Sequence, residues 1–312
     1  MAFPIVGLHH VTATVDQAQP DLDFFRRTLG LRLVKKTVNF DNHHVYHFYY
    51  GDERGTPGTI WTTFPYHGRG VRVGVKGAGQ VTETSFSVPP DSLDFWGARL
   101  RDAGLTVGAP RRRFGEPVLV ATDPSELRIE IVGADDERAP WAHGDVDTEQ
   151  AIRGLHSVTM TIREPKATLQ FMREWLGCDV LDEAENRMRV AVGAGGTGKQ
   201  IDLRIAPDAT AAINGIGTVH HVAMAIPTEA QQSQLREELL ARGVQVTPVM
   251  DRQYFKSIYF REPGGVLFEV ATLQPGFAVD EPLPQLGRAL KLPPWEEPNR
   301  ADIERGLATV SD

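Results

Sequence analysis

The stretch Gly217-Thr-Val-His-His-Val-Ala-Met-Ala-Ile226 has the pattern of a β-strand with two adjacent histidines near its start. Side chains alternate between the two faces of a strand. The apolar face carries Val222, Met224 and Ile226 and suits packing under a helix. The other face carries His221, which makes this strand a candidate site for chemistry.

Nearly the same pattern opens the chain, in Gly7-Leu-His-His-Val-Thr-Ala-Thr-Val15. Here His10 shares a polar face with Thr12 and Thr14. Two imidazoles on the polar faces of two similar strands favour a metal site with a third ligand. The best candidate is Glu269, near the end of Glu262-Pro-Gly-Gly-Val-Leu-Phe-Glu-Val270. The central hypothesis is therefore a metal held by His10, His221 and Glu269.

Internal repeats organise the rest of the chain. A shift of about 147 residues places Gly7-Leu8-His9 on Gly154-Leu155-His156, and a shift of about 139 residues places Arg113 on Arg252 and Glu130 on Glu269. The chain therefore consists of four related modules.

Each module has the same predicted layout of a strand, a helix and three further strands. In the first module these are residues 8–15, a helix at 21–29 ending near Gly30, and strands near 32–39, 44–50 and 59–64. The predicted fold class is α+β, with four βαβββ modules paired into two partial β-barrels. Ligands from modules one and four can meet only if these two modules share a barrel, which leaves modules two and three to form the other.

We expect three segments along the chain. Residues 1–140 form the N-terminal pair of modules, residues 151–272 form the C-terminal pair, and the Pro-rich residues 273–312 pack on the surface with a short helix near 301–307.

Composition narrows the function classes. The 312 residues are 41% hydrophobic and 24% charged, with a net charge of −8, which disfavours nucleic acid as a partner. A single cysteine, Cys178, excludes an intramolecular disulfide and a thiolate cluster. Because no run of 18 apolar residues and no secretory segment is found, we expect no membrane partner and a cytoplasmic location.

Several motifs together resemble a known family. They are Gly7-Leu8-His9-His10-Val11-Thr12, Asn39-Phe40-Asp41, Gly58-Thr59-Ile60-Trp61-Thr62-Thr63-Phe64-Pro65, Val219-His220-His221-Val222-Ala223, Asp251-Arg252 and Leu292-Pro293-Pro294-Trp295. The chain resembles the vicinal oxygen chelate superfamily, which includes glyoxalase I, bleomycin-resistance proteins and extradiol dioxygenases. Within it, the motifs look most like the hydroquinone-type ring-cleaving dioxygenases.

The resemblance implies a mononuclear Fe(II), with Mn(II), Zn(II) or Ni(II) as alternatives, bound by His10, His221 and Glu269. It also implies catalytic roles for His9, Thr12, His220, Arg252 and Tyr259. Strict alternation places His9 and His220 on the face opposite the ligands. Strand-end twist or a bulge must therefore bring these two histidines near the cleft.

The implied function is an extradiol-type, ring-cleaving dioxygenase that acts on a small hydroquinone-type aromatic with O2. A glyoxalase I-like lyase or isomerase is the alternative, although no convincing fourth ligand is present because Glu83 and Glu130 lie in the wrong modules. A metal-free binding module is a third candidate, disfavoured by the cost of burying the triad without a cation. The roles of His43, His44 and His47, the exact substrate and any homo-oligomer stay open.

A second metal site is not expected in the other barrel. The place of His10 is taken there by Ser157, and the place of Tyr259 by Val120. Glu130, the counterpart of Glu269, is therefore predicted to be structural or vestigial.

Overall fold

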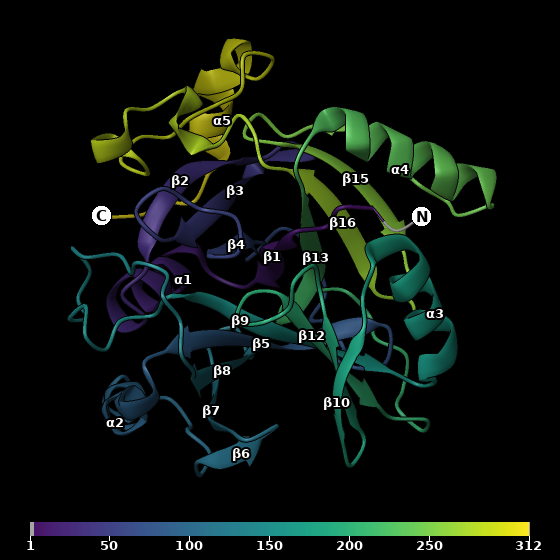
Figure 1. The fold of residues 1–312 in the computed structure, drawn as a ribbon. Helices are drawn as coiled ribbons and strands as arrows, with labels where there is room; N and C mark the ends of the chain where they lie inside the picture. Colours follow the sequence, from purple (N-terminus) through teal and green to yellow (C-terminus); the bar gives the residue numbers. More distant parts are fainter. Residues whose placement is uncertain (1–2, 312) are drawn as a thin grey trace.

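The computed structural model describes residues 3–311, in which sixteen strands form two curled, eight-stranded sheets (Figure 1). The first sheet holds β1 (Gly7–Val15), β2 (Arg32–Asn39), β3 (Asn42–Gly51), β4 (Ile60–Pro65), β13 (Thr218–Ile226), β14 (Met250–Asp251), β15 (Lys256–Arg261) and β16 (Leu267–Thr272). Its order is β14-β15-β16-β13-β1-β4-β3-β2. This sheet joins modules one and four through the antiparallel pair β1 and β13, as the sequence predicts.

The second sheet joins modules two and three. It holds β5 (Gln80–Val88), β6 (Arg111–Arg113), β7 (Glu116–Thr122), β8 (Arg128–Gly133), β9 (Gly154–Ile162), β10 (Val180–Ala184), β11 (Arg187–Ala191) and β12 (Gln200–Ile205). Its order is β10-β11-β12-β9-β5-β8-β7-β6. The predicted α+β fold of paired βαβββ modules is confirmed. Because each sheet draws strands from both halves of the chain, the division into segments at 140 and 151 stays a prediction.

One helix follows the first strand of each module. The α-helices are α1 (Ala18–Asp23), α2 (Leu93–Asp102), α3 (Pro165–Leu176), α4 (Glu229–Ala241) and α5 (Arg300–Gly306). The first helix begins three residues before the predicted start, with Pro20 in its first turn where no intrahelical N–H bond is lost. A π-helical turn, Phe24–Thr28, continues it and leaves both Phe24 and Phe25 buried. The short helix predicted near 301–307 is present as α5.

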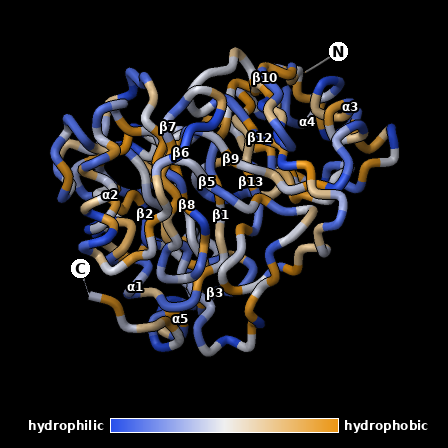
Figure 2. Tube along the Cα trace, turned by 90° about the horizontal axis from the view of Figure 1, so that it is seen from below, coloured by the Kyte–Doolittle hydropathy of each residue, from blue (hydrophilic) through white to orange (hydrophobic). Residues whose placement is uncertain are grey.

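The apolar faces of the central strands form the main core. Val11, Ala13 and Val15 of β1 pack in one cluster with Phe25 and Trp61, whereas the opposite face of β1 carries His10 and Thr12. Figure 2 shows hydrophobic and hydrophilic residues interspersed along the trace rather than gathered in separate segments. None of the helices between residues 3 and 311 is long and apolar enough to span a membrane.

The C-terminal tail is fixed against the first sheet. The ammonium group of Lys35, fully buried on β2, lies 2.5 Å from both Asp280 Oδ1 and Glu281 Oε2. Further along the tail, Leu292 and Ile303 bury apolar surface against Val38 of β2. The tail therefore closes the outer side of the β2–β3 hairpin, at the top of Figure 1.

Asp21 is an acidic group buried under the first sheet. Its Oδ2 accepts hydrogen bonds from the Tyr50 hydroxyl at 2.7 Å and from Thr63 Oγ1 at 2.6 Å. Burial raises the pKa of this carboxyl from 3.8 to about 7, although both hydrogen bonds oppose the rise. Between these two values the folded chain keeps a proton that the unfolded chain has lost, so this group's contribution to stability falls as the pH increases from about 4 to about 7.

We expect Asp21→Asn to remove this pH dependence. Its free energy of unfolding, relative to wild type, should rise by about 3 kcal/mol between pH 4.5 and pH 8, because one pKa unit corresponds to about 1.4 kcal/mol. Urea denaturation at several pH values measures the difference. Asp23→Asn, on the exposed side of the same helix, is the control and should show little change. A constant difference between Asp21→Asn and wild type across the range would contradict the assignment.

Candidate metal centre

Three side chains converge at the middle of the first sheet. His10 of β1, His221 of β13 and Glu269 of β16 are all buried. His10 Nε2 lies 3.3 Å from His221 Nε2 and 3.1 Å from Glu269 Oε2, and His221 Nε2 lies 2.8 Å from the same oxygen. The three atoms thus form a nearly equilateral triangle, and these residues are a candidate metal-ligand group.

The size of this triangle suits a metal ion. Donor atoms about 2.1 Å from an ion and at right angles to one another lie about 3.0 Å apart, close to the three observed separations. Moreover, Glu269 Oε2 is buried and has no hydrogen-bond partner among the described residues, whereas Glu269 Oε1 accepts a short hydrogen bond from Ser257 Oγ. A buried carboxylate oxygen without a hydrogen bond is costly, and a cation at this position would satisfy it.

Charge also favours a cation here. Burial by itself would raise the pKa of Glu269, but the adjacent His10 and His221 hold it well below 4.5. Burial lowers the pKa of His221, although Glu269 opposes the shift. The site therefore favours an ionised Glu269 carboxylate and a neutral His221 imidazole, the protonation states in which these groups bind metals.

Two β-bulges bring His9 and His220 beside the triad. In the β1–β13 ladder, Leu8 pairs with Met224 and His10 with Ala223, so His9 is an extra residue on its strand. The ladder then shifts again on β13, where His220 is the extra residue. A bulge releases a residue from strict alternation. The sequence leaves open whether strand-end twist or a bulge moves these two histidines, and the structure shows bulges.

Hydrogen bonds select the tautomer of His10. His9 Nε2 lies 3.2 Å from the Thr272 carbonyl oxygen, which only accepts, so His9 carries its proton on Nε2. His9 Nδ1 lies 2.9 Å from His10 Nδ1 and must therefore accept from it. This leaves the lone pair of His10 on Nε2, the atom that faces the triangle. Burial lowers the pKa of His9 to about 3, with His10 adding to the effect, so the ring stays neutral.

His220 has the same relation to His221. Their Nδ1 atoms lie 2.8 Å apart, and the Nε2 lone pair of His221 faces Glu269 if its Nδ1 donates. Burial lowers the pKa of His220 to about 3, and His221 adds to the shift. His220 then carries its own proton on Nε2.

A cavity of about 190 Å³ opens onto the triad. His220, Arg252 and Tyr259 line it, whereas His9 and Thr12 are buried behind its wall. The lining residues are His10, Asn39, Phe40, Asp41, His47, Tyr49, Phe64, Tyr66, His220, His221, Arg252, Phe255, Tyr259 and Glu269.

Arg252 and Tyr259 form one unit at the side of this cavity. Arg252 Nε donates to the Tyr259 hydroxyl at 3.2 Å, and Arg252 Nη2 donates to Asp41 Oδ2 at 3.2 Å. Burial raises the pKa of Tyr259, so its hydroxyl keeps the proton. Because this hydroxyl already accepts from Arg252, its proton is directed elsewhere.

Several residues in or beside the cavity have no clear signal in the sequence. Phe255 packs against the rings of both His9 and His10, with centroids 4.9 and 5.2 Å away, and Ser257 supports Glu269. Alternation from Glu269 across the hairpin could have indicated Ser257, but Phe255 lies on a loop without periodicity. Asp41 belongs to the Asn39-Phe40-Asp41 motif, which by itself indicates no role for the carboxylate.

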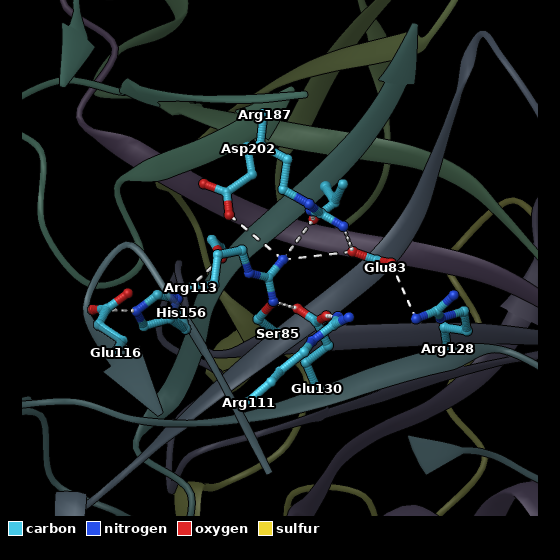
Figure 3. A network of polar contacts seen from close by, with 12 residues as sticks. Glu83, Ser85, Arg111, Arg113, Glu116, Arg128, Glu130, His156, Arg187 and Asp202 are labelled. Atoms are coloured by element: carbon cyan, nitrogen blue, oxygen red, sulfur yellow. Dashed lines mark hydrogen bonds and ion pairs between the residues drawn. The ribbon is translucent and has the colours of Figure 1, made fainter. Parts of the chain in front are cut away.

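The second sheet carries the counterpart of this site (Figure 3). It has the same two bulges, at Thr82 and His156, and its register places Glu83, Ser157 and Glu130 where the first sheet has His221, His10 and Glu269. Here, however, the guanidinium of Arg113 lies between the acids. It contacts Glu130 through a short ion pair and Glu83 at 3.5 Å.

Arg113 and Arg252 occupy equivalent places but act differently. Arg113 and Arg111 supply positive charge to Glu130, Arg111 at 3.1 Å, and Asp202 lies 3.6 Å from Arg113, as Figure 3 shows. Arg252 bonds instead to Asp41 and Tyr259, which leaves Glu269 Oε2 without a cation from the chain. The comparison supports a structural role for Glu130 and a metal-binding role for the first sheet.

Paired βαβββ modules with two histidines and a glutamate at the centre of one curled sheet define a class of protein built by module duplication. The family model "Glyoxalase/Bleomycin resistance protein/Dioxygenase superfamily" matches residues 7–131 and 154–270. The chain belongs to this superfamily.

Individual relatives cover nearly the whole chain. It is 42% identical over 299 residues to the "Putative ring-cleaving dioxygenase MhqE" of Bacillus subtilis, covering 95% of this chain and 96% of the relative. It is 38% identical over 318 residues to the "Chlorohydroquinone/hydroquinone 1,2-dioxygenase" of Sphingobium indicum, covering 99% and 97%.

Solved structures agree on the fold. A crystal structure titled as a putative dioxygenase from Bacillus subtilis superposes with a TM-score of 0.94 at 40% identity, covering 99% of both chains. Glyoxalase I from Zea mays superposes with a TM-score of 0.63 at 13% identity, covering 85% of this chain and 92% of that one, and shows the fold alone.

The ion pairs of the second sheet lead to a prediction about the free energy of unfolding. Arg113→Met should lower the free energy of unfolding by about 3–5 kcal/mol, because it removes the buried cation that the carboxylates of Glu83, Glu130 and Asp202 share. Arg111→Met, two residues away, removes a guanidinium whose side chain is 45% exposed and should cost less than about 1 kcal/mol. Urea denaturation of both variants measures the difference, and equal effects would contradict this account of the network.

Proposed function

We propose that this protein is a ring-cleaving dioxygenase that inserts O2 into a hydroquinone-type aromatic substrate, with a divalent metal held by His10, His221 and Glu269. The observation that carries the proposal is the triangle of donor atoms around a carboxylate oxygen that has no hydrogen-bond partner. Relatives named as ring-cleaving dioxygenases, 38–42% identical over nearly the whole chain, support the reaction class.

Fe(II) is the metal that best suits this reaction. Two histidines and one carboxylate on one face of an octahedron leave open positions and are typical of non-haem Fe(II) oxygenases. Bound there, Fe(II) would supply open positions for O2 and a substrate oxygen together and the redox chemistry that their reaction needs. Mn(II), Zn(II) and Ni(II) are alternatives that the ligand types alone would also accept.

The cavity suits a single aromatic ring. A buried cavity of about 150 Å³ is enough to bind benzene, and the cavity here measures about 190 Å³. Phe64, Tyr49 and Phe255 supply apolar walls, while polar groups line the rest. A monocyclic phenol with few substituents fits this space.

The residues in and around the cavity have separate roles in this proposal. Tyr259 donates its hydroxyl proton toward substrate or oxygen, and Arg252 orients Tyr259 while holding positive charge beside the cavity. His220 presents Nε2–H to the cavity that it lines. His9 has both ring nitrogens engaged, so it orients His10, and buried Thr12 lies next to His221 across the β1–β13 ladder. Cleavage of the extradiol type, beside the hydroxyl-bearing carbon, is part of the same proposal.

The glyoxalase I-like alternative finds less support. Such a centre usually adds a second carboxylate ligand. Among the residues that line this cavity, the other carboxylate is Asp41, which is paired with Arg252 at 3.2 Å. Glu83 and Glu130 belong to the second sheet and are neutralised by arginines.

The proposed function predicts a direct result. Protein loaded anaerobically with Fe(II) should consume one O2 per hydroquinone, and His221→Ala should retain no iron and consume no O2. An oxygen electrode and metal analysis measure both quantities, with a catechol panel for comparison. Bound iron without O2 uptake on any of these phenols would move the assignment to the lyase alternative. Failure to bind any divalent metal would contradict the ligand set.

The tautomer arrangement predicts a further effect on metal affinity. His9→Phe should weaken Fe(II) binding about 10- to 100-fold without changing the stoichiometry, since it removes the acceptor that orients His10. The control is His156→Phe, the same change at the matching bulge of the second sheet, which should leave Fe(II) affinity unchanged. Competition with a metal chelator measures both constants, and unchanged affinity in His9→Phe would exclude the orienting role.

A further inference from the structure

β3 carries three histidines, which differ in their surroundings. His43 Nδ1 lies 3.0 Å from Glu296 Oε2 and His44 Nε2 lies 2.9 Å from Asp302 Oδ2, so both bind the C-terminal tail. His47 instead lines the cavity together with Tyr49, two residues further along on the same face. Of the three, only His47 faces the candidate metal centre.

Hydrogen bonds fix the tautomer of His47. Its Nε2 lies 2.9 Å from Thr62 Oγ1, and the Thr62 hydroxyl donates its one proton to Thr12 Oγ1 at 2.8 Å. His47 Nε2 must therefore donate to Thr62, which leaves the lone pair on Nδ1. Within residues 3–311, Nδ1 makes no hydrogen bond, and it is not a buried atom. Because His47 lines the cavity, this acceptor is available to a bound molecule.

The ring of His47 is held in place and stays neutral. Tyr49 and Phe64 flank it, with ring centroids at 4.0 and 4.2 Å. Burial lowers the pKa of His47 well below 6.5, and the neighbouring His10, His221 and Arg252 lower it further. At neutral pH, His47 is therefore a fixed hydrogen-bond acceptor rather than a cation.

His47 and the triad line the cavity from different strands of the first sheet. The sheet order β13-β1-β4-β3 places β3 two strands from His10 on β1 and three strands from His221 on β13, or about 10 and 14 Å along the curled sheet at about 4.8 Å per strand. Register pairs His221 with Thr12, and Thr12 with Thr62, which His47 contacts. A ring that has one oxygen at the triad and lies along this row of contacts meets His47.

We propose that His47 Nδ1 accepts a hydrogen bond from the second hydroxyl of a para-dihydroxy ring and so selects hydroquinones over catechols. This inference rests on the proposed function. The two oxygens of a hydroquinone lie at opposite ends of the ring, so one reaches the triad while the other reaches His47. The oxygens of a catechol are neighbours, and with either at the triad the far end of the ring presents only C–H to His47.

The test compares hydroquinone with 4-methoxyphenol, which keeps one hydroxyl but has no proton on the other oxygen. Under anaerobic conditions, calorimetry on the metal-loaded protein should give a dissociation constant for hydroquinone about 10- to 100-fold lower than for 4-methoxyphenol. His47→Phe should raise the dissociation constant and the KM for hydroquinone by that factor and leave 4-methoxyphenol unchanged. His47→Asn, whose amide can place an acceptor near the Nδ1 position, should restore part of the preference.

A matched control is available on the same strand. His44→Phe makes the same change on the opposite face of β3 and should keep the wild-type ratio of the two dissociation constants. Metal content should be the same in all variants, since none of these residues belongs to the triad. Equal weakening of both ligands in His47→Phe, or no weakening of hydroquinone, would overturn the proposal. The ratio needs no turnover, so it is judged separately from O2 uptake, whose absence would contradict the proposed function instead.

Discussion

A buried carboxylate needs a positive partner, and the centre of each sheet is arranged around that need. Burying an ionised carboxylate without a cation is among the costliest events in folding. In the second sheet Arg113 meets the need from within the chain, through Glu130 and Glu83. In the first sheet the equivalent Arg252 is held by Asp41 and Tyr259, and Glu269 Oε2 is left to a ligand from outside. The same fold thus forms a closed network of ion pairs in the second sheet and an open candidate metal site in the first.

The bulges belong to the fold rather than to the chemistry. Both central strand pairs slip at the same places, at His9 and His220 in the first sheet and at His156 and Thr82 in the second. What differs is the side chain at each slipped position. In the first sheet, the imidazoles of His9 and His220 at these positions contact His10 and His221 of the triad. The bulges therefore determine which ring nitrogen of each triad histidine carries the proton.

Much of this architecture could be predicted because the duplicated modules repeat the same sequence pattern. The repeats predicted four related modules, and the hypothesis of a shared ligand set predicted that modules one and four lie together. Alternation placed His10 and His221 on the polar faces of two strands, which the structure brings together with Glu269 of a third strand. Alternation could not locate the bulges, since an inserted residue has no signature in strands made of similar residues. It could not separate His47 from His43 and His44 either, because their partners on β4 and in the tail are far away in sequence. The partners of Arg113 and Arg252 were equally hidden, since both arginines follow similar short strands.

The pairing of the first module with the last has a consequence for biosynthesis. β1 obtains its neighbour β13 from residues more than 200 positions downstream, and Glu269 is later still. A chain emerging from the ribosome therefore carries His9 and His10 on an unpaired strand edge through most of translation. The three candidate ligands are present together only when nearly the entire polypeptide has been made. Incomplete translation products consequently lack the complete candidate site, whose assembly is tied to the end of synthesis.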